Sequence, residues 1–186
     1  MNNNMLHKRT VEFRFLAEPT HVNFGGKVHG GMVMKWIDQV AYACAAGWSG
    51  LYCVTVSVGT IRFRRPILVG HQVELIARIV YTGTTSMHVL VQVRSGDTKG
   101  DEMLETNHCI ISFVALDAQG NTAAVPAWVP KTEEDRFLQQ YAVKTKAFIK
   151  AYGWKGPVFE ISALTGEGCQ QLCYAIQTDL DAKKAQ

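Results

Sequence analysis

The sequence lacks a hydrophobic run long enough to cross a bilayer, because Lys35 and Asp38 interrupt its most apolar segment. Its first ten residues, MNNNMLHKRT, contain no apolar core of a secretory signal. A strong charge of either sign is also missing, since the formal net charge is +3 over 186 residues. These absences favour a cytoplasmic protein and argue against a membrane or nucleic acid as partner.

Cysteine pairs with CxxC spacing are missing as well. The five cysteines are Cys44, Cys53, Cys109, Cys169 and Cys173, an odd number that lies mostly in apolar segments. This pattern is typical of reduced, structural thiols, and it predicts neither a disulfide framework nor a zinc site.

One long apolar segment is present, followed by several alternating ones. Residues 32–46 are apolar on nearly every side, which predicts a buried helix with Gly47 at its C-terminal cap. Period-two patterns predict a short strand before the helix and four after it, at residues 11–15, 53–63, 72–81, 87–94 and 108–117. Consecutive strands with short turns form an antiparallel meander that can bury one helix. The sequence therefore predicts an α+β protein with a curved antiparallel sheet wrapped around a central helix, the hotdog architecture.

The first strand after the helix has two different faces. Val54, Val56 and Val58 alternate with Thr55 and Ser57, so the valines are expected on one face and the two polar residues on the other.

The stretch HVNFGGKVHGGMVMKWID, residues 21–38, combines features that chemistry could use. Gly30 and Gly31 come at the start of the predicted helix, where free N–H groups suit a developing negative charge, as in an oxyanion hole. Asp38 follows two turns later on about the same side, and an acid among apolar neighbours is expected to be a more basic carboxylate. Asn23 could orient a water molecule or a carbonyl group.

Simpler readings of this stretch remain open. Asp38 could pair with Lys35 or cap a neighbouring segment, and the glycines could only turn the chain. The spacing is neither GxGxxG nor GxxxxGK[ST], which disfavours a nucleotide site. His21 and His29 lack the HxxxH spacing of helical metal ligands, so a hydrogen-bonded structural role is the commoner expectation.

Together with TVSVGTIRFRRPILVGHQVEL, residues 55–75, this stretch resembles the acyl-CoA thioesterases of the hotdog fold, particularly the YciA and brain acyl-CoA hydrolase group. The resemblance covers about residues 8–125. It implies hydrolysis of fatty acyl-CoA to free fatty acid and coenzyme A, by dimers assembled into hexamers. It implies that Asp38 activates water or attacks the thioester, that N–H groups near Gly30 and Gly31 polarise the carbonyl, and that Asn23 comes from the neighbouring subunit. No metal or redox cofactor is expected, because coenzyme A is part of the substrate and product.

Candidate contacts for coenzyme A follow from the basic residues and from the resemblance. Arginines suit phosphate groups, whereas a solvated sheet edge is the competing explanation for the same residues. The candidates are Ser57, Arg62, Arg64, Arg65, Thr84, Ser86 and Arg94, with Thr84 and Ser86 in a turn where the family has a similar polar pair.

The remainder of the chain follows a different pattern. A boundary is expected near Pro126 and Pro130, giving a hotdog domain at 8–128 and a linker helix with an appendage at 129–186. Thr132 and Asp135 are spaced as a capping box for that helix. Residues 146–176, KAFIKAYGWKGPVFEISALTGEGCQQLCYAI, are similar to the end of the GTP-binding domain of Obg-type GTPases.

The chain has no phosphate-binding GxxxxGK[ST] motif and no NKxD motif, so GTP hydrolysis is not expected. The appendage could be a remnant, could pack on the oligomer or a partner, or could bind a regulatory guanine nucleotide. For the main domain, the alternatives to a thioesterase are a hotdog hydratase and an acyl-CoA or nucleotide sensor without turnover. The hydratase is disfavoured because Gln39 and Val40, rather than a histidine, follow the acid.

Overall fold

The computed structural model describes residues 7–59, 61 and 63–151. The chain divides into two compact units between Thr145 and Lys146, and the first unit contains the sheet and the long helix. The Obg-type resemblance and the guanine-nucleotide hypothesis concern mainly residues 152–186, which lie outside the described part, so both stay predictions from sequence.

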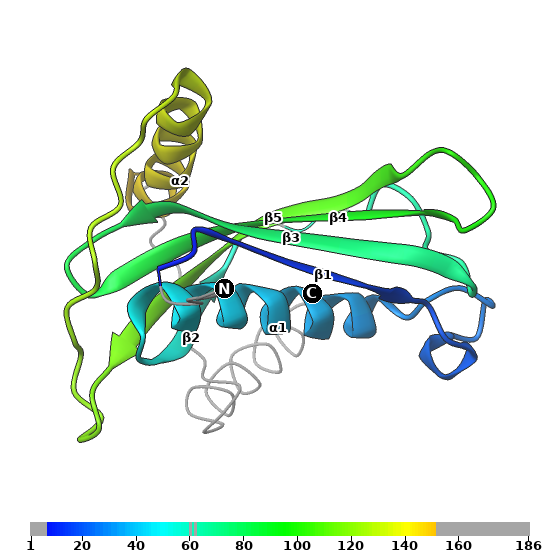
Figure 1. The fold of residues 1–186 in the computed structure, drawn as a ribbon, viewed down its shortest axis with the longest axis horizontal. Helices are drawn as coiled ribbons and strands as arrows, with labels where there is room; N and C mark the ends of the chain where they lie inside the picture. The colour runs from blue at the N-terminus through cyan, green and yellow to red at the C-terminus, as the bar shows by residue number, and fades with distance from the viewer. Residues whose placement is uncertain (1–6, 60, 62, 152–186) are drawn as a thin grey trace, which may run out of the picture. The chain divides into compact units, whose positions relative to one another are not determined.

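An antiparallel sheet and one long helix make up most of the first unit (Figure 1). In spatial order the described strands are β1 (Thr10–Leu16), β3 (His71–Thr82), β4 (Ser86–Asp97), β5 (Leu104–Leu116) and β2 (Tyr52–Val58). The predicted meander is right for β3, β4 and β5. It is wrong for β2, which pairs with β5 at the edge of the sheet instead of with β3. The connection over residues 59–70 is long enough to carry the chain from β2, at one edge of the sheet, to β3 near the other edge.

Helix α1 (Gly30–Ser49) lies along one face of the sheet and contacts all five strands. The helix is longer than predicted at both ends. Gly47 lies inside it, and the cap is Gly50, whose φ of 72° is left-handed and whose N–H donates to the Ala46 carbonyl at 2.8 Å. Glycine adopts this conformation without a steric penalty, which explains the stop at that residue.

Only one face of α1 is buried by the sheet. That face carries Val33, Trp36, Ile37, Val40, Ala41, Cys44 and Ala45. The opposite face is open, with Met34 37% and Tyr42 38% exposed and Asp38 exposed between them. The prediction of a helix buried all round, with Asp38 among apolar neighbours, is therefore wrong for the single chain. Its sequence is apolar on a face that this chain does not cover.

Strand β2 shows the same mismatch. Cys53 faces the core, whereas Val56 and Val58 are 46% and 44% exposed. Val56 and Val58 thus leave apolar surface on a sheet edge, beside the open face of α1.

Helix α2 (Glu133–Ala151) begins with the predicted capping box. The Asp135 N–H donates to the Thr132 hydroxyl at 3.1 Å, and the Thr132 N–H donates to the Asp135 carboxylate at 3.2 Å. Arg9 pairs with the same carboxylate at 2.6 Å and stacks over the Trp128 ring. Further along, Leu138 and Ala142 pack against Val80, Leu90 and Ile110 on the sheet face opposite α1. The start of α2 is thus tied by an ion pair to Arg9, the residue that precedes β1.

Replacing Asp135 with asparagine should lower the melting temperature at pH 7. Hydrogen bonds from the Lys131 N–H and pairing with Arg9 lower the pKa of Asp135 to about 2. A carboxyl group with a lowered folded-state pKa stabilises the fold above its unfolded pKa, and the contribution is lost as pH falls through the folded value. The difference between wild type and Asp135→Asn should therefore shrink between about pH 4 and pH 2. Thermal melts across that range check this, with Glu133→Gln as the control that removes a charge in the same turn.

The three described cysteines, Cys44, Cys53 and Cys109, are buried free thiols, as predicted for these positions. Burial raises the pKa of Cys44 and of Cys109 to about 12, so neither thiol is a reactive thiolate. Among the described helices, none combines the length and apolar character that a bilayer crossing requires.

Candidate active site

Residues 21–29 form a hairpin that leads into α1. The His29 N–H donates to the His21 carbonyl at 2.8 Å, and the Asn23 N–H donates to the Lys27 carbonyl at 2.7 Å. Between these two pairs, Val22 bridges to Val28. The glycines at the tip allow the reversal, since Gly26 has φ of 72°. The hairpin therefore holds Asn23 on one arm and delivers the start of α1 on the other.

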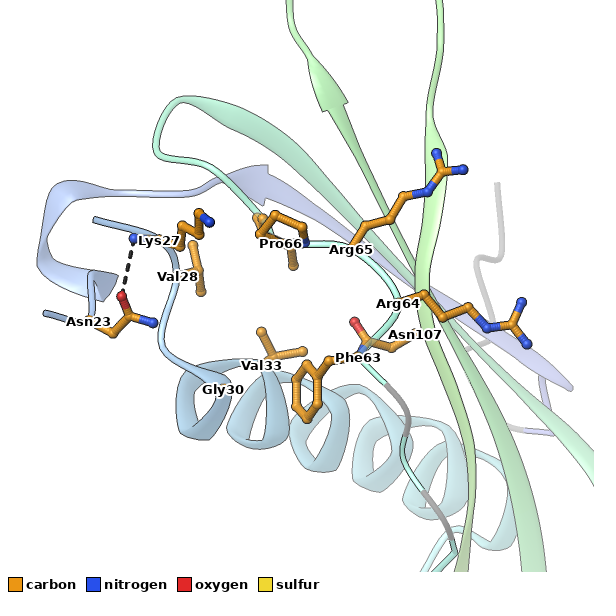
Figure 2. Close-up of a pocket in the computed structure, with 11 residues that line it drawn as sticks. Asn23, Lys27, Val28, Gly30, Val33, Phe63, Arg64, Arg65, Pro66 and Asn107 are labelled. Carbon is orange, nitrogen blue, oxygen red and sulfur yellow. Dashed lines mark hydrogen bonds between the residues drawn. The ribbon is translucent and has the colours of Figure 1, made fainter. Parts of the chain in front are cut away.

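The carboxamide of Asn23 has a fixed orientation. Its Oδ1 accepts hydrogen bonds from the Gly25 N–H at 2.8 Å and the Lys27 N–H at 3.3 Å. Figure 2 shows the consequence: the oxygen is turned to the hairpin backbone and the Nδ2 group toward the adjoining pocket. Asn23 can therefore act toward a ligand as a hydrogen-bond donor.

The first turn of α1 has one N–H group left over. The Gly31 N–H donates to His29 Nδ1 at 2.9 Å, and the Met32 and Val33 N–H groups donate to the His29 carbonyl. Among the first-turn N–H groups, all within the described residues, only that of Gly30 has no protein acceptor. Of the two N–H groups predicted as donors, that of Gly30 is available to a ligand, whereas that of Gly31 is occupied by His29.

Asn23 and Gly30 line one pocket of about 310 Å³. Its floor is apolar, and two carboxamides, from Asn23 and the buried Asn107, face it (Figure 2). The other lining residues are Lys27, Val28, Val33, Phe63, Arg64, Arg65, Pro66 and Ile67. The structure thus brings Asn23 and Gly30, two of the predicted catalytic residues, together with two of the arginines predicted for coenzyme A.

The guanidinium groups of Arg64 and Arg65 are turned away from the pocket interior, toward its rim (Figure 2). Arg64 lies 3.6 Å from the Glu105 carboxylate, and both arginines are exposed. They are available to a charged group that lies outside the pocket. Arg62 falls outside the described residues.

Asp38 is not among the residues that line this pocket. It follows Gly30 by eight residues, which places it about 12 Å further along the helix axis. Its carboxylate accepts a hydrogen bond from the Thr55 hydroxyl of β2 at 2.8 Å. The chain therefore carries the acid and the N–H donors as two separate groups.

The remaining candidates lie apart from the pocket. Arg94 pairs with Glu74 at 3.3 Å and donates to the Met103 carbonyl, and Ser57 is exposed on β2. Thr84 and Ser86 lie at the turn between β3 and β4, at the opposite end of the strands from the pocket.

Three residues of the candidate site were not predicted from sequence: Thr55, Lys27 and Asn107. Strand alternation placed Thr55 on the face opposite the valines but not beside Asp38, and nothing in the local pattern singled out the other two. His21 and His29 do have the structural, hydrogen-bonded role expected of them, since His21 Nδ1 accepts from the Glu18 N–H and His29 caps α1. Within the described residues, no group of three or more His, Cys, Asp or Glu side chains could hold a metal ion.

The chain is similar to known proteins in family, sequence and fold. Residues 25–101 match the Thioesterase superfamily. An uncharacterised acyl-CoA thioester hydrolase of Bacillus subtilis is 33% identical over 145 residues, which span 73% of this chain and 84% of the relative. The protein VdlD of Helicobacter pylori is 34% identical over 142 residues, spanning 74% and 81%.

The similar solved structures are likewise acyl-CoA hydrolases or thioesterases. A hexameric acyl-CoA thioesterase in its apo form superposes with a TM-score of 0.76 at 30% identity, covering 81% of this chain and 97% of that one. An acyl-CoA hydrolase of Staphylococcus aureus, solved with butyryl coenzyme A and coenzyme A, superposes with a TM-score of 0.71 at 28% identity, covering 77% and 88%.

The Staphylococcus aureus hydrolase has also been solved as three alanine variants. They replace one asparagine, one aspartate and one threonine. In that chain the asparagine precedes the aspartate by 15 positions, and the aspartate precedes the threonine by 17.

Proposed function

The chain belongs to the thioesterase superfamily and is an acyl-CoA hydrolase, and from that premise we propose how its residues carry out the reaction. The substrate is a fatty acyl-CoA, and the products are the free fatty acid and coenzyme A. The observation that carries the proposal is the convergence of two hydrogen-bond donors, the Gly30 N–H and Asn23 Nδ2, on one pocket beside a helix N-terminus.

Each active site combines two copies of the chain. The reacting atoms of a nucleophile and a carbonyl must approach to about 3–3.5 Å. Gly30 and Asp38 are about 12 Å apart along α1 in one chain, too far to act on the same thioester. A second copy whose α1 runs antiparallel to the first would bring its Asp38 beside the donors of the first copy.

Exposed apolar surface supports an interface at this place. The open face of α1, with Met34 and Tyr42, adjoins the edge strand β2, with Val56 and Val58. A second copy related by a two-fold axis would continue the sheet edge to edge along β2 and bury both surfaces. We propose such a homodimer. We also propose that three of these dimers form a hexamer, because a similar acyl-CoA thioesterase is hexameric.

The chemistry follows from these positions. The Asp38 carboxylate accepts a proton from a water molecule as the water oxygen attacks the thioester carbonyl carbon. The Gly30 N–H and Asn23 Nδ2 donate to the oxyanion that forms, which lowers the barrier. Collapse of this intermediate breaks the carbon–sulfur bond, and the thiolate takes the proton from Asp38. Thr55 holds the carboxylate in place through its hydroxyl hydrogen bond.

The same three residue types occur with the same spacing in the Staphylococcus aureus hydrolase. Asn23, Asp38 and Thr55 follow one another at intervals of 15 and 17 positions, as do the asparagine, aspartate and threonine replaced in that enzyme. This agreement supports Thr55 as a third member of the site.

Coenzyme A has its phosphates near the rim arginines in this proposal. Arg64 and Arg65 extend outward from the pocket that receives the thioester, so they are placed to meet a charged group on the solvent side. A guanidinium group binds phosphate through two parallel hydrogen bonds. Arg62, Ser57, Thr84, Ser86 and Arg94 remain candidates for the same contact, several of them from a neighbouring copy.

Release of free thiol from acyl-CoAs of graded chain length tests the activity. A hydrolase liberates thiol with turnover. A hydratase changes the acyl chain without releasing thiol, and a sensor binds the substrate without consuming it. Absence of thiol release at every chain length would therefore contradict the proposed function.

Replacing Asn23 with aspartate should lower kcat by roughly a hundredfold while leaving the hairpin intact. The new side chain keeps an oxygen to accept the Gly25 and Lys27 N–H groups, but it replaces the Nδ2 donor with a second acceptor. Loss of one oxyanion donor costs about 10²–10³ in kcat. Thiol release and melting temperature measure the two effects separately. Full activity in Asn23→Asp would show that Asn23 supports the hairpin only.

A further inference from the structure

We propose that His29 is a positioning residue, which fixes the start of α1 so that the Gly30 N–H is the single helix donor to the oxyanion. The inference rests on the proposed function and assigns the two glycines different tasks. Gly30 meets the substrate, whereas Gly31 makes room for the His29 ring.

The helix needs such a device because it begins with two glycines. Glycine is among the poorest helix formers, about 1 kcal/mol worse than alanine at an interior position. A flexible first turn would leave the donor poorly oriented at the moment of reaction. Histidine is not among the usual N-cap residues, yet its Nδ1 here accepts the Gly31 N–H at 2.9 Å. The neutral ring that accepts through Nδ1 carries its proton on Nε2.

His29 is itself held in place by contacts that lead back to the core. Its backbone N–H donates to the His21 carbonyl, and the His21 ring packs edge-on against Trp36 of α1 with centroids 5.0 Å apart. Trp36 is buried and in turn meets Phe15 of β1 at 4.8 Å. A continuous set of contacts therefore runs from the core to the cap, so the position of His29 is set by packed side chains.

The space around the glycines separates their tasks. A Cβ at Gly31 would lie 3.0 Å from His29 Nδ1 and 3.2 Å from its Cε1, close enough to displace the ring from its hydrogen bond. A Cβ at Gly30 would lie 3.5 Å from the Phe63 ring, an ordinary contact on the pocket side. The steric demand at position 31 thus comes from His29.

The first test compares His29→Ala with His29→Asn in the full-length protein. Asparagine is a preferred N-cap and restores an acceptor, whereas alanine has none. Loss of an N-cap weakens the start of a helix enough to disturb the orientation of the Gly30 N–H. We therefore expect kcat to be roughly tenfold lower in His29→Ala, with KM little changed. In His29→Asn, kcat should stay within about threefold of wild type. Equal losses in both variants would overturn the proposal, because they would show that the imidazole itself is needed. Wild-type kcat in His29→Ala would overturn it as well.

The second test places Gly31→Ala in two backgrounds. In the wild-type background it should lower kcat by roughly three- to tenfold without lowering the melting temperature, because alanine favours the helix while its Cβ displaces the ring. In the His29→Asn background the same change should cost little, because the ring is gone. Equal losses in the two backgrounds would show that the substrate, not His29, requires the second glycine.

Hydrogen exchange of the Gly31 amide gives a measurement that does not depend on activity. Exchange should be slow in the wild type and in His29→Asn and fast in His29→Ala. This result would support the cap even if no thiol were released, so failure of the proposed function and failure of the cap are distinguishable. Fast exchange in the wild type would contradict the cap directly.

Discussion

Replacing Asp38 with alanine is expected to abolish thiol release, with kcat at least a hundredfold lower and oligomer size unchanged. Proton transfer by a positioned side chain contributes about 10²–10⁴ in rate, and the proposed site has no second acid to take over. The more conservative Asp38→Asn keeps a side-chain oxygen for the Thr55 hydroxyl but cannot accept a proton from water. It should be as inactive as Asp38→Ala.

Mixing two inactive variants tests whether a site spans two chains. Asp38→Ala lacks the acid and Asn23→Ala lacks the donor, so each homodimer has no complete site. A mixed dimer combines both defects in one site and leaves the other site intact. Random 1:1 exchange makes half of the dimers mixed, so activity should recover to roughly a quarter of wild type. Mass spectrometry confirms exchange, and exchange without recovered activity would show that each site lies within one chain.

Introducing lysine at Val56 is expected to dissociate the dimer and to reduce activity by roughly a hundredfold or more. Val56 is 46% exposed on the edge strand β2, in the surface proposed to pair with a second copy. A buried lysine without a partner is costly, and lysine is a residue that natural edge strands use to prevent pairing. The acid and the donors of each composite site come from two chains, so they would then be in separate molecules. Hydrolysis should therefore fall as the dimer dissociates.

Val129→Lys is the matched control for this change. Val129 is 67% exposed and lies outside the proposed interface, so its replacement should alter neither oligomer size nor activity. Light scattering and thiol release on the same samples decide the outcome. A Val56→Lys protein that is monomeric and fully active would contradict the composite site. One that stays oligomeric and active would place the interface elsewhere.

Local patterns predicted the elements well because their apolar periodicity is strong. The helix predicted at residues 32–46 is the core of Gly30–Ser49, and each of the five predicted strands overlaps an observed strand. The position of β2 did not follow, because a long connection carries no information about which strand its ends will join. The sequence also made α1 look buried all round, since an apolar residue has the same signature whether its own chain or a second copy covers it. Met34 and Tyr42 are examples of that ambiguity.

For the site, the sequence indicated which residues could take part, but not which of their atoms are free to contact a ligand. Asn23 and Gly30 of the same chain line one pocket, whereas the resemblance implied that Asn23 comes from the neighbouring subunit. The direction of the Asn23 carboxamide and the occupation of the Gly31 N–H depend on hydrogen bonds that form only when the hairpin closes. Thr55 was missed as a partner of Asp38 because the two residues meet only through the packing of a strand on a helix.

The closed neck of the hairpin, between His21 and His29, makes the start of α1 independent of the side chain at position 24. Two backbone hydrogen bonds flank the Val22–Val28 bridge and fix the neck, so a changed side chain at Phe24 does not displace the start of α1. Phe24, fully exposed at that tip, is free to vary with whatever lies across from it. A designer could therefore exchange the Phe24 side chain beside the reaction centre, provided that the Gly25 and Lys27 N–H groups still hold the Asn23 carboxamide.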